Sequence, residues 1–346
     1  MLIGKGIRRR VLPDSRIPGN WQSFLRLDKN KQELFEFLSN EAINISTEKV
    51  IVSTIGEVAV TNGSSDLSFM SPSNHEEADT RMLLHAMDAS QKGATLVLIR
   101  TVDTDVVVIA IAMFSSLDLF QLWLSFGVGK HQRMLSIHSL FNALGESKCK
   151  CLPFFHAFTG CDQVSFFAGR GKKVAWTIWN QHEEVTSSFL ALSNCPSSSE
   201  CDVALPSIER FVSLLYDRTS TETSVNKCRK VLFASKGRSL EGIPPTSDAL
   251  LQHTKRAIYQ AGYCWSQSLV AQQNLPNPNE WGWKSEEDES FTISWITIPQ
   301  ASAICYELIR CGCKKEKGCK GRCKCRKATL KCTALCKCSG DCDDGL

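Results

Sequence analysis

The sequence predicts a mixed α/β body followed by a small cysteine-rich module, and three observations lead to this prediction. The 346 residues are 43% hydrophobic and 22% charged, which is typical of a globular protein. Stretches of helical and of strand-like periodicity alternate along most of the chain. Nine of the 17 cysteines then fall between positions 311 and 342. A chain of this length has room for one large domain, or two ordinary ones, plus a small module.

The first elements are predicted from local patterns. Residues 30–42 (NKQELFEFLSNEA) predict an amphipathic helix, and residues 50–62 predict strand, turn and strand. Residues 73–93 predict a helix that ends at Gly93. Ser73 or Asn74 is expected to cap this helix, and the Glu three residues later, Glu76 or Glu77, is expected to complete a capping box.

The middle of the chain predicts a buried strand over residues 95–100 and a hairpin over residues 120–138, turning at Gly127 and Gly129. Residues 106–111 (VVVIAI) are β-branched and predict a strand by propensity.

The later elements are a serine-rich loop, two helical regions, a polar linker-like stretch and one more strand. They cover residues 181–205, 206–235, 246–269, 272–290 and 291–299, respectively. The expected domains are a core over 1–180, a mostly helical extension over 181–271, a linker with a strand over 272–310, and the cysteine module over 311–342.

Acidic residues gather where a ligand site is expected in an α/β fold. Glu77 and Asp79 lie at the start of the predicted 73–93 helix, Asp103 and Asp105 follow the predicted strand, and Asp162 follows an apolar segment. Ligands collect beyond the carboxyl ends of strands in open sheets, and carboxylates suit a hard divalent cation. The plain alternative is that acids in a first helical turn complement the helix dipole.

A glycine turn with two lysines follows these acids. Gly169, Gly171, Lys172 and Lys173 open an apolar stretch that runs to Trp179. A Gly-x-Gly turn that enters a helix presents backbone N–H groups and lysines to a phosphate. An ordinary glycine turn before a basic helix start explains the same residues.

Over about residues 70–180, the order of four motifs resembles the 5′-nuclease (XPG and flap-endonuclease) branch of the PIN-like superfamily. These motifs are E-E-A-D, then D-x-D after a strand, then G-C-D, and then G-x-G-K-K-x-A. The resemblance implies that acids bind two Mg²⁺ or Mn²⁺ ions, that a glycine hairpin grips duplex DNA, and that residues 106–111 are helical. The matching acids are Glu77 with Glu76 or Asp79, then Asp103 and Asp105, then Asp162; the matching hairpin glycines are Gly169 and Gly171.

The family begins with a strand that bears an early aspartate, and this sequence departs from that pattern. Asp14 and Asp28 are the only early aspartates, and neither follows an apolar strand. We therefore expect either a body that is truncated at its N-terminus or a degraded copy of the fold, with an incomplete carboxylate site whose catalysis is weak or lost. The alternative is an active Mg²⁺- or Mn²⁺-dependent, structure-specific nuclease.

The last segment combines thiols with positive charge. Residues 311–346 carry ten Lys or Arg and four Asp or Glu, a net charge of +6, so the other 310 residues carry about −2. Two copies of C-x3-C-x-C start 13 residues apart. The nine cysteines are Cys311, Cys313, Cys319, Cys323, Cys325, Cys332, Cys336, Cys338 and Cys342.

An odd number of thiols in an intracellular chain argues against a disulfide scaffold and favours zinc, which can organise a segment without a core. Three zinc ions need about twelve ligand positions, and nine thiolates supply them if three bridge two ions each. Such a cluster carries −3 against +6 from the side chains, so the segment stays basic and can face phosphate.

This segment resembles the CXC domain of the tesmin/TSO1 family, zinc modules that bind DNA. Members that read a minor groove have a tyrosine before the fourth cysteine, where this chain has Arg322. The expected nucleic-acid contacts of the module are Arg322, Lys324, Arg326 and Lys327. Together with the predicted body, the resemblance implies a DNA-associated nuclear protein with about three zinc ions; a non-enzymatic adaptor with a structural zinc tail is the further alternative.

No membrane segment is expected. The start MLIGKGIRRRVLPD runs from a short apolar stretch into charge, unlike a signal peptide. The longest apolar run, Val106 to Phe114, is far shorter than the roughly 18 residues of a membrane span.

Overall fold

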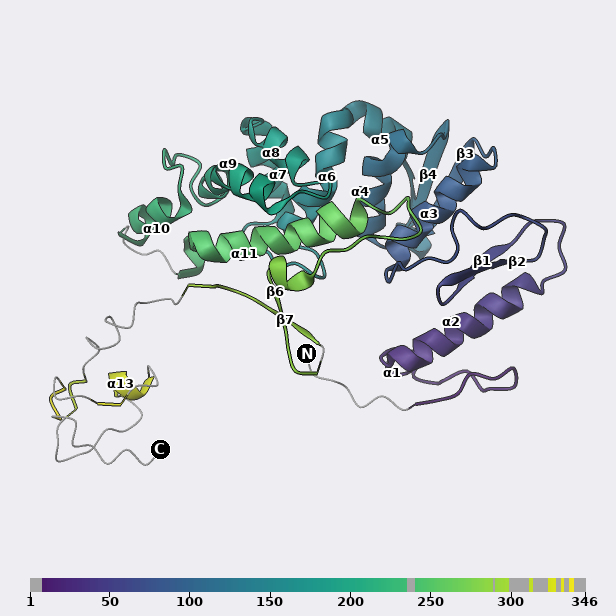
Figure 1. Cartoon of the computed structure of the whole chain (residues 1–346), viewed down its shortest axis with the longest axis horizontal. Helices are drawn as coiled ribbons and strands as arrows, with labels where there is room; N and C mark the ends of the chain where they lie inside the picture. Colours follow the sequence, from purple (N-terminus) through teal and green to yellow (C-terminus); the bar gives the residue numbers. More distant parts are fainter. Residues whose placement is uncertain are drawn as a thin grey trace. The chain divides into compact units, whose positions relative to one another are not determined.

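Figure 1 shows the computed structural model, which describes residues 8–234, 240–288 and 290–298, and 311–313, 323–327, 331–332 and 336–338 of the cysteine-rich segment. The chain forms two compact units, Met1–Trp295 and Ile296–Leu346. The larger unit is mixed α/β, as the sequence predicts, and helices outweigh its small sheets.

The described helices of the larger unit are α1 (Trp21–Leu25), α2 (Asp28–Ile43), α3 (Ala78–Gln91), α4 (Thr104–Met113), α5 (Ile137–Leu144), α6 (Glu146–Phe158), α7 (Lys172–Gln181), α8 (Val185–Ala191), α9 (Ser198–Tyr216), α10 (Val225–Ala234), α11 (Ser247–Ala257) and a π-helix (Ile258–Trp265). Short 3₁₀ turns cover Phe114–Ser116, Gly129–His131, Leu240–Gly242 and Pro278–Glu280.

Three small sheets accompany the helices. β1 (Val52–Ile55) and β2 (Val58–Thr61) form the predicted antiparallel hairpin, which packs beside α2 (Figure 1). β3 (Leu96–Thr101) runs parallel to β4 (Gln121–Phe126), and β4 pairs antiparallel with β5 (Arg133–Ser136), which confirms the predicted 120–138 hairpin. β6 (Trp283–Ser285) pairs with β7 (Phe291–Ile293), so the strand predicted over 291–299 is shorter than expected.

The strand predicted by propensity over residues 106–111 is wrong, because this segment is helix α4. Asp103 caps the helix by accepting a hydrogen bond from the Asp105 backbone N–H at 2.9 Å. Val106, Ile109 and Ala110 have no exposed surface, and α4 packs on both α3 and α6. Burial on all sides overrides β propensity, since a helix that is apolar all round belongs in a core.

One continuous core joins the sheet to the later helices. It includes Leu122 on β4, Ile109 on α4, Phe158 on α6, Phe211 on α9 and Trp265 on the π-helix. The helical region expected as an extension over 181–271 therefore shares its core with the preceding residues. Contacts within the chain divide it after Trp295, not at positions 180 or 271.

The capping box expected at the start of residues 73–93 does not form, and α3 begins at Ala78. Asn74 instead pairs with the backbone of Gln273: its amide donates to the Gln273 carbonyl at 2.9 Å, and its oxygen accepts from the Gln273 N–H at 2.7 Å. The His75 ring also hydrogen-bonds the Val270 carbonyl at 2.6 Å. A contact between distant segments thus replaces the local cap.

Two stretches expected as loop or linker are structured. The predicted loop over 181–205 contains α8 and the start of α9, which has a capping box between Ser197 and Glu200. The predicted linker over 272–290 folds onto the body, where Trp281 is buried and the Arg256 guanidinium donates to the Gly282 carbonyl at 3.1 Å. In the described part of the chain, no helix is both long and apolar enough to cross a membrane.

Candidate functional site

Three of the predicted acids meet beyond the end of β3. Asp103 is the N-cap of α4, Asp105 lies in its first turn, and Asp79 lies in the first turn of α3. One carboxylate oxygen from each residue lies within 4.8 Å of the other two. Oxygen ligands of Mg²⁺ at about 2.1 Å are separated by no more than about 4.2 Å, so small side-chain rotations would let one cation bind all three.

The electrostatics of Asp79 show how crowded this cluster is. Burial and the negative charges of Asp103, Glu77, Asp105 and Asp162 raise its pKa to about 6. Burial favours the neutral acid, and each neighbouring carboxylate repels the charged form. The site therefore concentrates negative charge, which a divalent cation would neutralise.

Glu77 is held apart from the three aspartates by the π-helix. Its carboxylate accepts hydrogen bonds from the Gln260 amide at 3.1 Å and from the Trp265 indole N–H at 3.3 Å. Burial raises the pKa of Glu77, although both hydrogen bonds act in the opposite direction. Asp162 is exposed on the segment after α6, and its charge reaches Asp79.

His156 joins the site, although sequence reasoning did not single it out. It lies on α6 with only 8% of its surface exposed, and its Nε2 is 2.8 Å from a carboxylate oxygen of Asp105. This contact restrains the Asp105 carboxylate. The sequence offers no spacing signal for it, because His156 and Asp105 are 51 positions apart.

The glycine turn and its lysines divide into an exposed part and a buried part. Gly169 has a φ of +68°, and Gly171 is the N-cap of α7. Lys173 is exposed, as expected of a phosphate contact.

Lys172 does not face outward, contrary to expectation. Its amine donates to the carbonyls of His156 and Gly160, each at 2.5 Å, and to the Thr159 hydroxyl at 3.1 Å. These acceptors lie at the carboxyl end of α6, where the helix dipole favours a cation. Burial lowers the pKa of Lys172 to about 8.

Seven of the nine predicted zinc ligands are described, and their sulfurs converge. Sγ atoms of Cys311, Cys325, Cys332 and Cys336 lie within 4.8 Å of one another, as do those of Cys311, Cys313 and Cys323. Cys311 and Cys338 sulfurs are 3.5 Å apart. Cys319, Cys342 and Arg322 lie outside the described residues.

The sulfur separations fit zinc and not disulfides. The sulfur separations of 3.7 Å between Cys311 and Cys332 and of 3.8 Å between Cys323 and Cys332 are far longer than the S–S bond of about 2.05 Å. Four thiolates at about 2.3 Å from a tetrahedral ion are separated by about 3.8 Å. The cysteine-rich segment can therefore bind zinc.

The basic residues that the structure describes in this segment are exposed. α13 (Lys324–Lys327) places Cys325 in the interior, while Lys324, Arg326 and Lys327 are exposed. Three cationic side chains thus lie at the surface of the described part of this segment.

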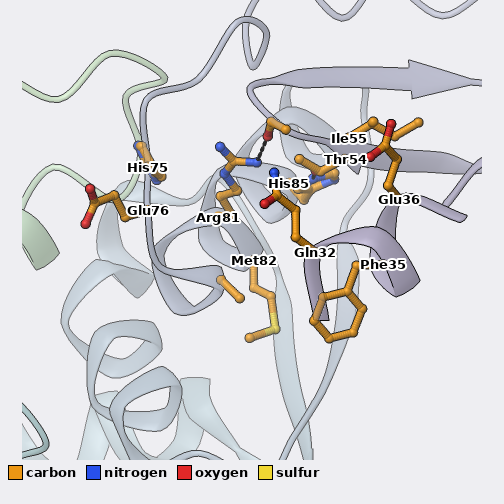
Figure 2. Close-up of a pocket in the computed structure, with 12 residues that line it drawn as sticks. Gln32, Phe35, Glu36, Thr54, Ile55, His75, Glu76, Arg81, Met82 and His85 are labelled. Atoms are coloured by element: carbon orange, nitrogen blue, oxygen red, sulfur yellow. Dashed lines mark hydrogen bonds between the residues drawn. The ribbon is translucent and has the colours of Figure 1, made fainter. Parts of the chain in front are cut away.

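Two hollows are lined in part by Glu76 or Glu77, but none of the three aspartates lines either of them. Figure 2 shows the larger one, about 700 Å³, between α2, β1 and the start of α3. Arg81 stands at its centre and donates to the Gly56 carbonyl at 2.5 Å, while Glu76 is turned away from the other labelled residues. The second hollow, about 360 Å³, includes Glu77 in its lining.

Comparisons with known protein families, with curated proteins and with solved structures found no match for this chain.

Proposed function

We propose that this chain is a DNA-associated nuclear protein with a zinc-binding CXC-type module and a PIN-like body that holds a divalent cation, with weak or lost catalysis. The observation that carries the proposal is the meeting of Asp79, Asp103 and Asp105 at the end of β3. The first turns of α3 and α4 bring carboxylates from separate parts of the chain together, and their mutual repulsion, added to burial, raises the pKa of Asp79. Cation binding would offset that cost.

The residues of the chain prepare this site for a phosphate-bound cation. Asp103 is fixed by its own cap hydrogen bond, and Asp105 is oriented by His156. Bound Mg²⁺ or Mn²⁺ supplies charge neutralisation for phosphate and lowers the pKa of a coordinated water. Glu77 and Asp162 lie outside the group that the three aspartates form, which argues for a weakened centre; the convergence of Asp79, Asp103 and Asp105 favours the alternative, an active nuclease.

The zinc module supports association with DNA. Cys311 belongs to both described groups of sulfurs, as a bridging thiolate would, which agrees with a cluster of about three ions. The exposed Lys324, Arg326 and Lys327 are placed to neutralise phosphates, and such contacts give binding a steep salt dependence.

The test uses zinc-loaded full-length protein, labelled flap and duplex DNA, and Mg²⁺ or Mn²⁺. An Asp103→Ala/Asp105→Ala variant reports on the cluster, and Asp118→Ala, an exposed aspartate outside it, is the matched control. Salt-dependent binding without cleavage is the expected result. Cleavage that only the double variant loses would establish the active nuclease. Absence of both binding and cleavage would refute the proposal and favour the adaptor.

A further inference from the structure

The smaller hollow is lined by Glu77 and by residues next in sequence to two of the site acids. Glu77 lines it, together with Thr80 and Gln163, the neighbours in sequence of Asp79 and Asp162. Its volume of about 360 Å³ falls within the range of about 300–1,000 Å³ that is usual for small-molecule pockets. A group bound there would lie next to whatever the aspartates hold.

The π-helix builds one wall of this hollow. A π-helix pairs residues five apart, so Tyr259 and Cys264 share one face, and Gln260 and Trp265 share the next. Tyr259, Gln260 and Cys264 line the hollow, while Gln260 and Trp265 both donate to Glu77. In an α-helix, residues five apart would point in different directions. π-Helical turns are rare and occur often at functional sites.

The opposite wall comes from the β6–β7 hairpin and is aromatic. Trp283 and Phe291 line the hollow from this side, and 47% of Phe291 is exposed. With Tyr259, they place three aromatic residues around one small space. Aromatic rings at a nucleic-acid site serve as stacking partners for unpaired bases.

The polar groups of the lining suit the edge of a base better than a phosphate. Gln163 is exposed and offers an amide with both donor and acceptor atoms, and Glu76 offers an exposed carboxylate. Among the described lining residues there is no lysine or arginine. A phosphate would be repelled by the exposed carboxylate of Glu76, whereas the amino groups of a base would find acceptors.

A cationic side chain is the competing occupant, since aromatic rings with carboxylates also attract ammonium groups. Glu77, however, already accepts hydrogen bonds from Gln260 and Trp265, so its carboxylate oxygens are engaged within the protein. Neutral aromatic and amide groups therefore dominate the lining.

We infer that this hollow takes one unstacked nucleobase of single-stranded DNA, while the adjacent phosphate lies at the aspartate cluster. The inference rests on the proposed DNA association and specifies the substrate as a strand with at least one unpaired, splayed nucleotide. Stacking on Tyr259, Trp283 and Phe291 would select for an unpaired base with little preference among the four.

The test uses full-length, zinc-loaded protein with Ca²⁺ and single-stranded DNA that carries 2-aminopurine, whose fluorescence falls on stacking. A matched oligonucleotide with abasic sites reports backbone binding, and anisotropy gives both Kd values. Phe291→Ala and Trp283→Ala are expected to reduce quenching and to raise Kd about tenfold for the normal strand, but not for the abasic one. Phe120→Ala, a phenylalanine with 80% exposure outside the lining, should behave as wild type.

Urea unfolding of each variant shows that it is folded before binding is measured. Quenching and affinity that stay unchanged in both pocket variants would overturn the inference while leaving DNA association intact. Loss of all DNA binding by the wild type would overturn both. A trimethyl-lysine peptide that binds through Phe291 without displacing DNA would instead assign the hollow to a cation and refute base binding.

Discussion

Replacing Asp79 by asparagine should stabilise the larger unit at neutral pH, although it removes a residue of the candidate site. Burial and the neighbouring carboxylates raise the Asp79 pKa from 3.8 to about 6, so the folded state holds its proton more tightly than the unfolded state. Between these two pKa values, stability falls as pH rises, because the charged form is penalised only in the folded state. Above pH 6 the full penalty is present.

The magnitude follows from the same pKa difference. A rise of about two units at about 1.4 kcal/mol per unit gives an upper limit of about 3 kcal/mol. Asp79 is only half buried, and solvent screening roughly halves this figure, to about 1.5 kcal/mol. Asp79→Asn should gain about that much at pH 7.5 and almost nothing at pH 4, where the wild-type side chain is already neutral.

Urea unfolding at pH 7.5 and pH 4, without Mg²⁺ or Mn²⁺, measures this difference. Asp118→Asn, an exposed aspartate with the same charge change, is the control and should shift stability by no more than about 0.5 kcal/mol. Added Mg²⁺ should stabilise the wild type more than Asp79→Asn. A variant that is no more stable at pH 7.5, or equally stabilised at both pH values, would refute the reasoning.

Three further predictions follow from the packing and the cysteines. Gly262→Ala should lower the free energy of unfolding in urea by about 1–3 kcal/mol, because the new Cβ would lie 2.8 Å from the Leu192 carbonyl oxygen. A Cβ at Gly171 would meet nothing within 4 Å, so Gly171→Ala should change stability little. Equal losses of stability in the two variants would contradict this reasoning. Lys172→Met should destabilise the protein by about 1–3 kcal/mol, because it leaves buried acceptors unpaired. Lys173 is exposed, so Lys173→Met should instead reduce the salt slope of DNA binding by about one. The reverse pattern would contradict the placement of the two amines. Cys311→Ser should lower the zinc content of the purified protein by more than the loss of one ligand from a single ion would explain, since Cys311 belongs to both sulfur groups. Metal analysis measures this content, and an unchanged value would exclude Cys311 as a zinc ligand.

Features set by local chemistry could be predicted from the sequence. The β1–β2 and β4–β5 hairpins formed where turn glycines separate apolar runs, and Asp103 and Asp105 came to the end of β3 because they follow that strand directly. The duplicated spacing of the cysteines likewise predicted metal-binding thiols, and the sulfurs of Cys311, Cys325, Cys332 and Cys336 lie within 4.8 Å of one another.

Contacts between distant segments escaped prediction because no local pattern encodes them. Asn74 hydrogen-bonds the backbone of Gln273 instead of capping the helix as expected, and the Lys172 amine binds the carboxyl end of α6 instead of facing the surface. The order of residues alone made Asp105 a candidate ligand, but only packing of α4 against α6 brought His156 to it.

The sequence by itself determined which acids, thiols and basic residues the chain offers, and in which local elements most of them begin. Only the tertiary structure decided which of them meet: it brought Asp79 to Asp103 and Asp105, and it held Glu77 at the π-helix. The physical reason is that caps, turns and ligand spacings are short-range, whereas burial, like-charge repulsion and the five-residue register of a π-helix depend on what packs around each segment.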